Sequence, residues 1–491
     1  WLTNTVLSDL NDMSEKIGRK VYLEEFLTNK DVIFSPENLA KIEAIYGSKY
    51  ISALKDALYR MENGTNRPSG EDATTNKWLN WINQSTGAIM FFNRRSAALQ
   101  LLSTVNFINW SDNNPVKAAM AFANQKQFWT DFSMLFNSPK LKQRRAGLKT
   151  DVSQAEIANA VAGQTNKAAA VLNYLLKIGF TPTQIADSFA IASGGASFYR
   201  NRVNTYVKQG MSKENAEKLA FEEFSSTADE SQQSSDPMLI SQQQATMLGR
   251  LVLAFQNTTM QFSRLMKKST LDLINGRGDP KTHISKIIYY GAVQNFVFSA
   301  LQSALFSFIP GFGDDDEYDE SKTREEKLEG ATGRIINGMI DSVLRGTGLT
   351  GAVIATLKNA IIKYTEQEEK GYNANHIYTF LAVLSIMPPV GSKFSKLYKA
   401  QQTKTFEKDA LKARPFGVVA DGRVNLGPGY SIVGNLAAAT FSIPGDRIVD
   451  EVTSISEALD SRNSQWQRLA LAIGYKSWAV GAKNEEHDLL K

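Results

Sequence analysis

The chain has 491 residues, of which 43% are hydrophobic and 21% are charged. This length is enough for several domains with sizeable cores. The 33 glycines and only 13 prolines exclude collagen-like and proline-rich disordered classes, and a mean hydropathy of −0.27 excludes a protein built mainly of membrane-spanning helices. The net charge of +5 is unevenly spread, because residues 78–309 are basic and residues 314–329 are acidic. This asymmetry indicates an anionic partner for the basic part.

Residues that commonly hold metals or act as nucleophiles are scarce. Cysteine is absent, which removes disulfides, thiolate zinc sites and cysteine nucleophiles. The three histidines, His283, His376 and His487, lie far apart and form no metal-binding spacing. We therefore predict a protein that is not an enzyme and that has no catalytic residue, no cofactor and no metal site.

Capping signals predict several helix starts. Ser35-Pro36 and Asn114-Pro115 each place a capping side chain before a proline at the first helical position, and an apolar stripe follows both. Thr181-Pro182-Thr183-Gln184 has the form of a capping box around a proline. Ser212 is predicted to cap a helix that runs to Phe224, with a polar loop after it.

Apolar residues recur at helical spacing from Leu248 to Met266, which predicts one amphipathic helix. The segment 275–278 stops this helix, and Asp279-Pro280 starts the next. Strand signals are confined to residues 416–426, where Asp421-Gly422 separates two β-branched runs. We therefore predict an all-α, extended multi-helix protein with several helical subdomains and at most this short β-hairpin.

Composition shifts predict five regions along the chain. They are an N-terminal helical region 1–66, a main helical region 76–313 that ends in an apolar helix, an acidic linker 314–330, a helical region 331–413 with apolar segments, and a C-terminal region 414–491.

Residues 287–309 contain no charged side chain and are long enough to cross a bilayer, which takes about 20 residues. Three amides within the segment, Gln294, Asn295 and Gln302, would each need a partner in lipid. Two interpretations stay open, a buried core helix and a helix that inserts into a membrane. Later charge-poor stretches at 348–357, 372–392 and 424–445 are too short or too broken for a span. The residues that would contact lipid are Ile287, Phe296, Phe298, Leu301, Leu305, Phe306 and Ile309.

A basic run without any acidic residue lies close to four aromatic residues. Such a mixture suits contacts to phosphate or to an anionic membrane surface. The alternative is a solvated run beside a core stripe, since Phe128, Phe132 and Phe136 are spaced four apart on a helix. The candidate anion contacts are Lys140, Lys142, Arg144, Arg145 and Lys149.

Three motifs have simple structural interpretations. Gly346–Gly351 matches G-x-G-x-x-G, but a helical pattern over 334–344 precedes it, so we predict a joint between helices instead of a dinucleotide site. Arg277-Gly278-Asp279 is predicted to be a turn between helices. The acidic cluster at 314–320 lacks the spacing of a calcium-binding loop and is predicted to be a solvated hinge.

Eight segments between residues 78 and 309 share a further pattern. They are 87–96 (GAIMFFNRRS), 105–112 (VNFINWSD), 143–147 (QRRAG), 184–195 (QIADSFAIASGG), 198–202 (FYRNR), 230–235 (ESQQSS), 248–251 (LGRL) and 275–279 (NGRGD). In these segments the chain resembles the large polyvalent proteins of bacteriophage virions, a group that includes the packaged cargo proteins of crAss-like and related short-tailed phages.

The resemblance implies a non-enzymatic cargo protein that is stored in the capsid or tail and ejected with the genome. After ejection it would lie in the host envelope or cytoplasm, where insertion into the envelope would aid DNA delivery. The implied partners are other virion proteins (portal, tail or other cargo), phage DNA and the host membrane. Two alternatives stay open, a helical accessory domain of an ejected virion enzyme such as an RNA polymerase polyprotein, and a static tail or portal scaffold.

Overall fold

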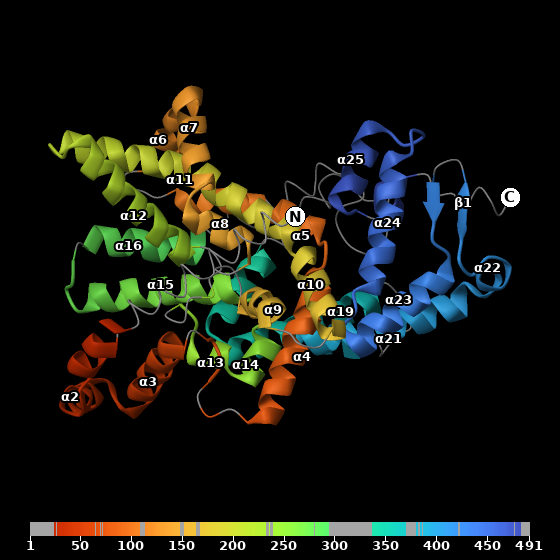
Figure 1. Ribbon diagram of the computed structural model, residues 1–491, viewed down its shortest axis with the longest axis horizontal. Helices are drawn as coiled ribbons and strands as arrows, with labels where there is room; N and C mark the ends of the chain where they lie inside the picture. Colours follow the sequence, from red (N-terminus) through yellow and green to blue (C-terminus); the bar gives the residue numbers. More distant parts are fainter. Residues whose placement is uncertain are drawn as a thin grey trace. The chain divides into compact units, whose positions relative to one another are not determined.

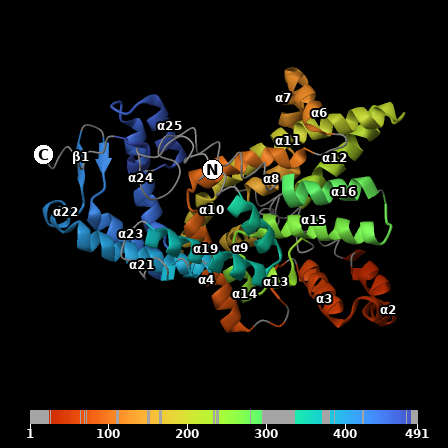
Figure 2. The same ribbon diagram turned by 180° about the vertical axis from the view of Figure 1, so that it is seen from behind.

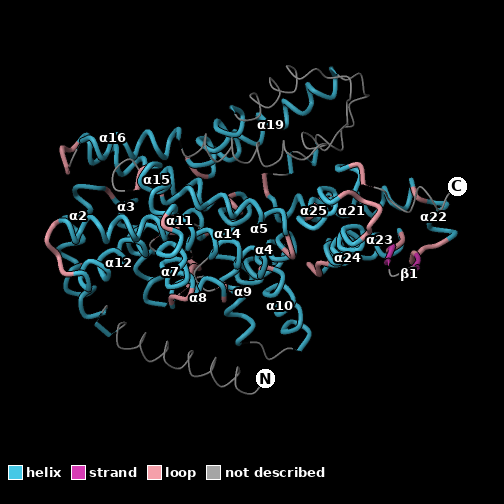
Figure 3. The backbone as a smooth tube through the Cα atoms, turned by 90° about the horizontal axis from the view of Figure 1, so that it is seen from above, coloured by secondary structure: helices cyan, strands magenta, loops and turns pink. Residues whose placement is uncertain are grey.

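The computed structural model describes residues 24–293 and 336–482, apart from short gaps at 26, 64, 69, 71, 109–112, 148–151, 164–166, 232–234, 236–238, 279, 370–379, 382, 385, 421–422 and 476. Helices dominate this part of the chain, and Figures 1 and 2 show them from two opposite sides. The predicted all-α fold is confirmed. Two short strands, β1 (Val418–Ala420) and β2 (Arg423–Asn425), pair antiparallel with Val419 opposite Val424. They lie within the predicted range 416–426 and are the magenta segments of Figure 3.

The chain divides into two compact units. The first unit comprises Trp1–Ala73 and Asp236–Thr246, and the second comprises Thr74–Ser235 and Met247–Lys491. The first division falls between the predicted regions 1–66 and 76–313. The predicted acidic linker 314–330 lies outside the described residues, and the other region boundaries stay predictions.

The first unit is built around two consecutive helices, α2 (Pro36–Tyr46) and α3 (Ser48–Asn63), with the short α13 (Gln242–Ala245). The Ser35 side chain accepts a hydrogen bond from the Asn38 backbone N–H, so the predicted start of α2 is confirmed. Buried Arg60 on α3 pairs with Asp56 at 2.9 Å and donates to the Ile240 carbonyl at 3.0 Å. This guanidinium therefore holds the returning segment against α3.

The second unit contains all the remaining described elements. Its α-helices are α4 (Ala73–Met90), α5 (Arg94–Gln100), α6 (Pro115–Ala123), α7 (Gln125–Phe136), α8 (Pro139–Arg145), α9 (Val152–Gly163), α10 (Lys167–Gly179), α11 (Thr181–Lys208), α12 (Lys213–Ser231), α14 (Met247–Val252), α15 (Asn257–Ile274), α16 (Pro280–Ile288), α19 (Leu349–Glu369), α21 (Pro388–Phe406), α22 (Lys408–Ala413), α23 (Pro428–Phe441), α24 (Gly445–Leu459) and α25 (Gln465–Ile473). The second unit also contains two 3₁₀ helices, η1 (Leu101–Phe107) and η3 (Ser477–Val480), a π-helical turn, η2 (Tyr289–Val293), and a helix over residues 336–346.

The main hydrophobic cluster of the second unit surrounds α11. Buried Ile191 and Phe198 on this helix pack with Phe107 of η1 and Phe224 of α12. The predicted aromatic core stripe on α7 is confirmed, because Phe128 is buried and the next two phenylalanines of the stripe pack against the same cluster. Three smaller clusters of four buried residues each are separate from it. They are Ala88, Ile157, Leu176 and Phe180; Val252, Leu253, Met260 and Ala352; and Ala470, Leu471, Tyr475 and Val480.

Two predicted helix boundaries and one predicted cap are wrong because of tertiary packing, although α11 begins at Thr181 as the sequence predicts. The capping box at Thr181 does not form, since buried Phe180 joins α10 to α11 with helical backbone angles. The helix after Ser212 continues past Phe224 to Ser231 because Ala228 packs in the main cluster. The single helix predicted over 248–266 is broken at 253–256, where Phe255 has a φ of 66°.

Other local predictions are confirmed. Asn114 caps α6 through its side chain, and α15 ends at Ile274 before the glycine-containing turn that precedes α16. The G-x-G-x-x-G motif joins a helix over 336–346 to α19, so it is the joint between helices that the sequence predicts.

A partly buried lysine fastens the C-terminus of α23 to its neighbours in the second unit. The Lys393 ammonium, on α21, donates to the Ala439 carbonyl at 2.8 Å and to Ser442 Oγ at 3.0 Å. It also lies 5.2 Å from the centre of the Trp81 ring. Burial, together with repulsion from Lys396, lowers the pKa of Lys393 to about 8.

This shift predicts a pH dependence of stability. An unfolded lysine keeps a pKa near 10.5, so between about pH 8 and about pH 10 the unfolded chain binds more protons than the folded chain, and the free energy of unfolding rises with pH. We expect Lys393 to contribute about 1 kcal/mol to this rise, since a partly buried ammonium keeps part of its hydration. Urea denaturation at both ends of this range should show a smaller rise for Lys393→Gln than for the wild type. Equal rises in the two proteins would contradict the lowered pKa.

Candidate functional site

The structure does not gather the predicted basic run on one surface. Lys140 pairs with Asp229 at 2.6 Å and donates to the Ser225 carbonyl at 2.7 Å. Arg144 is fully buried and makes two hydrogen bonds to Asp187, at 2.9 Å and 3.2 Å. These two cations therefore hold α8 against α11 and α12.

The remaining three members of the run have different surroundings. Arg145 donates to the Phe136 carbonyl at 2.7 Å, and its guanidinium lies 4.1 Å from the centre of the Phe136 ring. Burial lowers the pKa of Arg145. Lys142 is exposed, whereas Lys149 lies outside the described residues. Within the run, Lys142 is thus a solvent-facing cation.

Basic residues nevertheless supply the outward charge of α6, α7 and α8. Lys117 on α6, Lys126 on α7 and Lys142 on α8 are exposed. The one acidic residue in the sequence from 113 to 147, Asp131, is buried and pairs with Arg200. Each of these three helices therefore presents one exposed lysine to solvent.

Aromatic rings form a continuous series from α6 through α7 to α11, the first two of which carry Lys117 and Lys126. Phe122 contacts Phe128, which contacts Trp129, and Trp129 contacts Phe132, with ring centres 4.9–5.3 Å apart. Phe132 in turn contacts Phe189 of α11 at 5.1 Å. About half of the surface of Phe122 (52%) and of Trp129 (48%) is exposed. We call the three lysines and the exposed rings of Phe122, Trp129 and Phe189 the basic–aromatic surface; α6, α7, α8 and α11 are labelled in Figure 1.

The sequence identifies this surface only in part. The aromatic stripe of α7 is visible from its spacing, and Trp129 lies beside it. Phe189 has no sequence signal, because it enters the series from α11, more than 50 residues further along the chain. Positive charge beside exposed rings can bind phosphate groups and stack planar bases.

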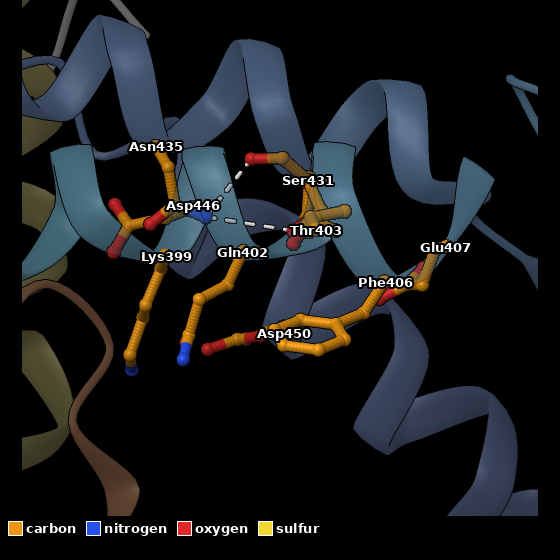
Figure 4. Close-up of a pocket in the computed structure, with 10 residues that line it drawn as sticks. Lys399, Gln402, Thr403, Phe406, Glu407, Ser431, Asn435, Asp446 and Asp450 are labelled. Carbon is orange, nitrogen blue, oxygen red and sulfur yellow. Dashed lines mark hydrogen bonds between the residues drawn. The ribbon is translucent and has the colours of Figure 1, made fainter. Parts of the chain in front are cut away.

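A hollow lies between α21, α23 and α24 and has a volume of about 350 Å³ (Figure 4). Lys399, Asp446 and Asp450 bring charges of both signs to its lining. Asn435 donates to the Ser431 carbonyl at 2.9 Å, and Asp446 pairs with Lys396 at 3.3 Å. The mixed charge selects no ligand, so we assign no site to this hollow.

The predicted membrane segment lies mostly outside the described residues. Ile287 belongs to the end of α16, whereas Phe296, Phe298, Leu301, Leu305, Phe306 and Ile309 are not described. Among the helices that are described, none combines the length and the apolar character that crossing a bilayer requires. Over the same residues, no three His, Asp or Glu side chains come together as a metal site would need.

Comparisons with protein families, with curated proteins and with solved structures find no match for this chain.

Proposed function

We propose that this chain is a non-enzymatic bacteriophage virion protein, stored in the particle with the genome and ejected with it into the host. The observation that carries the proposal is the basic–aromatic surface, whose exposed lysines and rings suit the phosphates and bases of nucleic acid. In a protein kept beside tightly packed duplex DNA, the lysines of this surface would contact phosphates, and the rings would stack on bases only where strands are unpaired. The sequence resemblance to large polyvalent virion proteins supports the same function.

The organisation of the core also supports ejection. A stored protein must pass a narrow tail, which requires parts of the fold to open. Among the residues that the structure describes, the three small clusters of the second unit each hold four buried residues with two or three partly buried ones packed against them, separate from the main cluster around α11. Regions with few buried apolar contacts open at a lower free energy than a main core does. The helices around these clusters can therefore unfold locally while the main cluster persists.

Reversing two charges on the basic–aromatic surface should weaken nucleic-acid binding. We expect Lys126→Glu/Lys142→Glu to bind single-stranded DNA at least about tenfold more weakly, with a salt dependence that is shallower by about 1.4 in logarithmic slope, or about 0.7 for each lost phosphate contact. Fluorescence anisotropy with a labelled oligonucleotide at several salt concentrations measures both quantities. Trp129→Ala should weaken the binding of single strands more than that of duplexes, because stacking requires unpaired bases.

The matched control reverses two exposed lysines elsewhere, Lys404→Glu/Lys408→Glu. Its net charge is the same as that of the first variant, so the two variants differ only in where the charges are reversed. If DNA binds at the basic–aromatic surface, the DNA affinity of this control should stay within about twofold of wild type. Equal losses in the two variants would show that only the net charge acts.

The location of the protein is tested in the phage that encodes it. Quantitative mass spectrometry should find the chain in purified virions and show its depletion from particles that have released their DNA. A chain retained in emptied particles would indicate a static scaffold. A chain missing from the virions would overturn the proposed function.

A further inference from the structure

Two helices of the second unit form a pair whose shared face is polar. We call residues 336–346 and residues 349–362 of α19 the helix pair. Asn337 donates to Asn359 at 3.2 Å, and Asn359 in turn donates to Asp341. Lys358 pairs with Asp341 at 2.8 Å and also donates to Asn337. The polar groups of this face are thus directed at one another across the pair.

The outward positions of the same helices are apolar. Away from the joint, exposed apolar residues recur every three or four positions along each helix. They form one row on each helix. Their exposed fractions lie between 44% and 67%. These residues are Ile336, Ile340 and Val343 on the first helix and Ile354, Leu357 and Ile361 on α19. A helix in water normally has the opposite arrangement, with its apolar stripe inside and its charges outside.

The charges of the pair point to the nature of its partner. Residues 336–362 contain three charged side chains, Asp341, Arg345 and Lys358, and all three are partly buried. Arg345 lies 3.4 Å from Thr356 Oγ1, across the pair from it. Over residues 336–362 the outer rows therefore carry no charge, which complements a neutral apolar medium, and the charged residues Lys363, Glu366, Glu368 and Glu369 follow at the C-terminal end of α19. Ionisable residues within a bilayer pair with one another in the same way.

The area of these rows argues against a second protein molecule. Helices of 11 and 14 residues are about 16 Å and about 21 Å long, so an outer face about 10 Å wide offers roughly 200 Å² on each helix. The two faces together reach about half of the roughly 800 Å² per partner that a stable protein interface buries.

We propose that the outer rows of the helix pair contact the hydrocarbon of a lipid bilayer and that the pair enters one leaflet without crossing the membrane. Over these residues its two helices are about 16 Å and about 21 Å long, both shorter than the hydrocarbon thickness of about 30 Å. The joint of the pair is fixed to the second unit, because Gly346 packs closely against Thr259 and Ser263, and Ala352 is buried against Val252. This site goes beyond the proposed function and does not use the basic–aromatic surface.

The absence of cysteine allows a direct test. The single-cysteine variants Ile340→Cys and Ile361→Cys, labelled with an environment-sensitive nitrobenzoxadiazole fluorophore, are mixed with neutral phosphatidylcholine vesicles. We expect a blue shift and a several-fold rise of emission at both positions, because the fluorophore leaves water. The same label on Lys208→Cys, an exposed position at the end of α11, should not respond. Circular dichroism of each labelled protein checks that its helix content is unchanged.

The other outcomes separate this proposal from the proposed function. Insertion must persist in neutral vesicles and at high salt, whereas binding through the basic–aromatic surface requires anionic groups and weakens with salt. Silent labels in vesicles that nevertheless bind the chain would overturn the proposal and leave the proposed function intact. A blue shift without vesicles that grows with protein concentration would assign the rows to a second copy, and would also overturn it. Ile340→Ser/Ile361→Ser should lower vesicle partitioning at least about tenfold.

Discussion

Replacing Arg144 by methionine is expected to lower the free energy of unfolding by about 3–5 kcal/mol. The guanidinium is fully buried, and it makes two hydrogen bonds to an Asp187 carboxylate whose side chain is only 5% exposed. Gln100 donates to the same carboxylate at 2.9 Å but brings no charge. The variant would leave a buried carboxylate without its counter-ion. Urea denaturation, monitored by far-ultraviolet circular dichroism, measures the loss.

The control substitution is on the same short helix. Lys142→Met changes side-chain type in a similar way at an exposed position of α8, so its effect should stay within about 0.5 kcal/mol. Arg144→Met/Asp187→Leu should recover most of the lost stability, because both buried charges are then removed together. A loss of less than about 1 kcal/mol in Arg144→Met alone would mean that water or another cation reaches Asp187 when the arginine is gone.

Sequence predicts this fold best where the determinants are local. Ser35 and Asn114 bond backbone groups three residues away, so their capping is readable from a few positions. The predictions that fail concern residues whose conformation depends on contacts with distant parts of the chain. Phe180 keeps helical angles because its ring is buried in a cluster with residues of other helices. The break before α15 coincides with Leu253, which packs against Ala352, almost 100 residues further along the chain.

The same distinction explains the candidate surfaces. The basic run is a local pattern, but the acidic partners of Lys140 and Arg144 lie 89 and 43 residues away, so the run alone cannot show which cations reach solvent. The helical pattern over 334–344 is visible in the sequence and confirmed over 336–346. Its apolar row has the spacing of an ordinary core stripe. The polar contacts across the pair, such as that of Asp341 with Lys358, show that the polar side of this helix faces its neighbour.

The second large effect is expected from a single added methyl group. A Cβ atom on Gly194 of α11 would lie 2.3 Å from the Thr104 carbonyl oxygen and 2.7 Å from the Phe107 ring. The obstacle includes backbone of η1, which cannot move aside like the end of a flexible side chain. We therefore expect Gly194→Ala to lower the free energy of unfolding by about 3 kcal/mol, the upper part of the usual range for overpacking, although alanine is intrinsically the better helix former by about 1 kcal/mol.

Ser193→Ala is the matched control, since the neighbouring residue is partly exposed on the same turn of α11 and should change stability by less than about 0.5 kcal/mol. Phe107 can pack close to Gly194 because glycine has no Cβ atom. Its ring stacks on Phe224, with ring centres 5.7 Å apart, inside the main cluster. A displaced η1 would therefore disturb the contact between α11 and α12 as well. Thermal denaturation of the two variants should then differ by several degrees. A Gly194→Ala protein as stable as the wild type would mean that η1 shifts freely and that the main cluster is packed more loosely around α11 than these distances indicate.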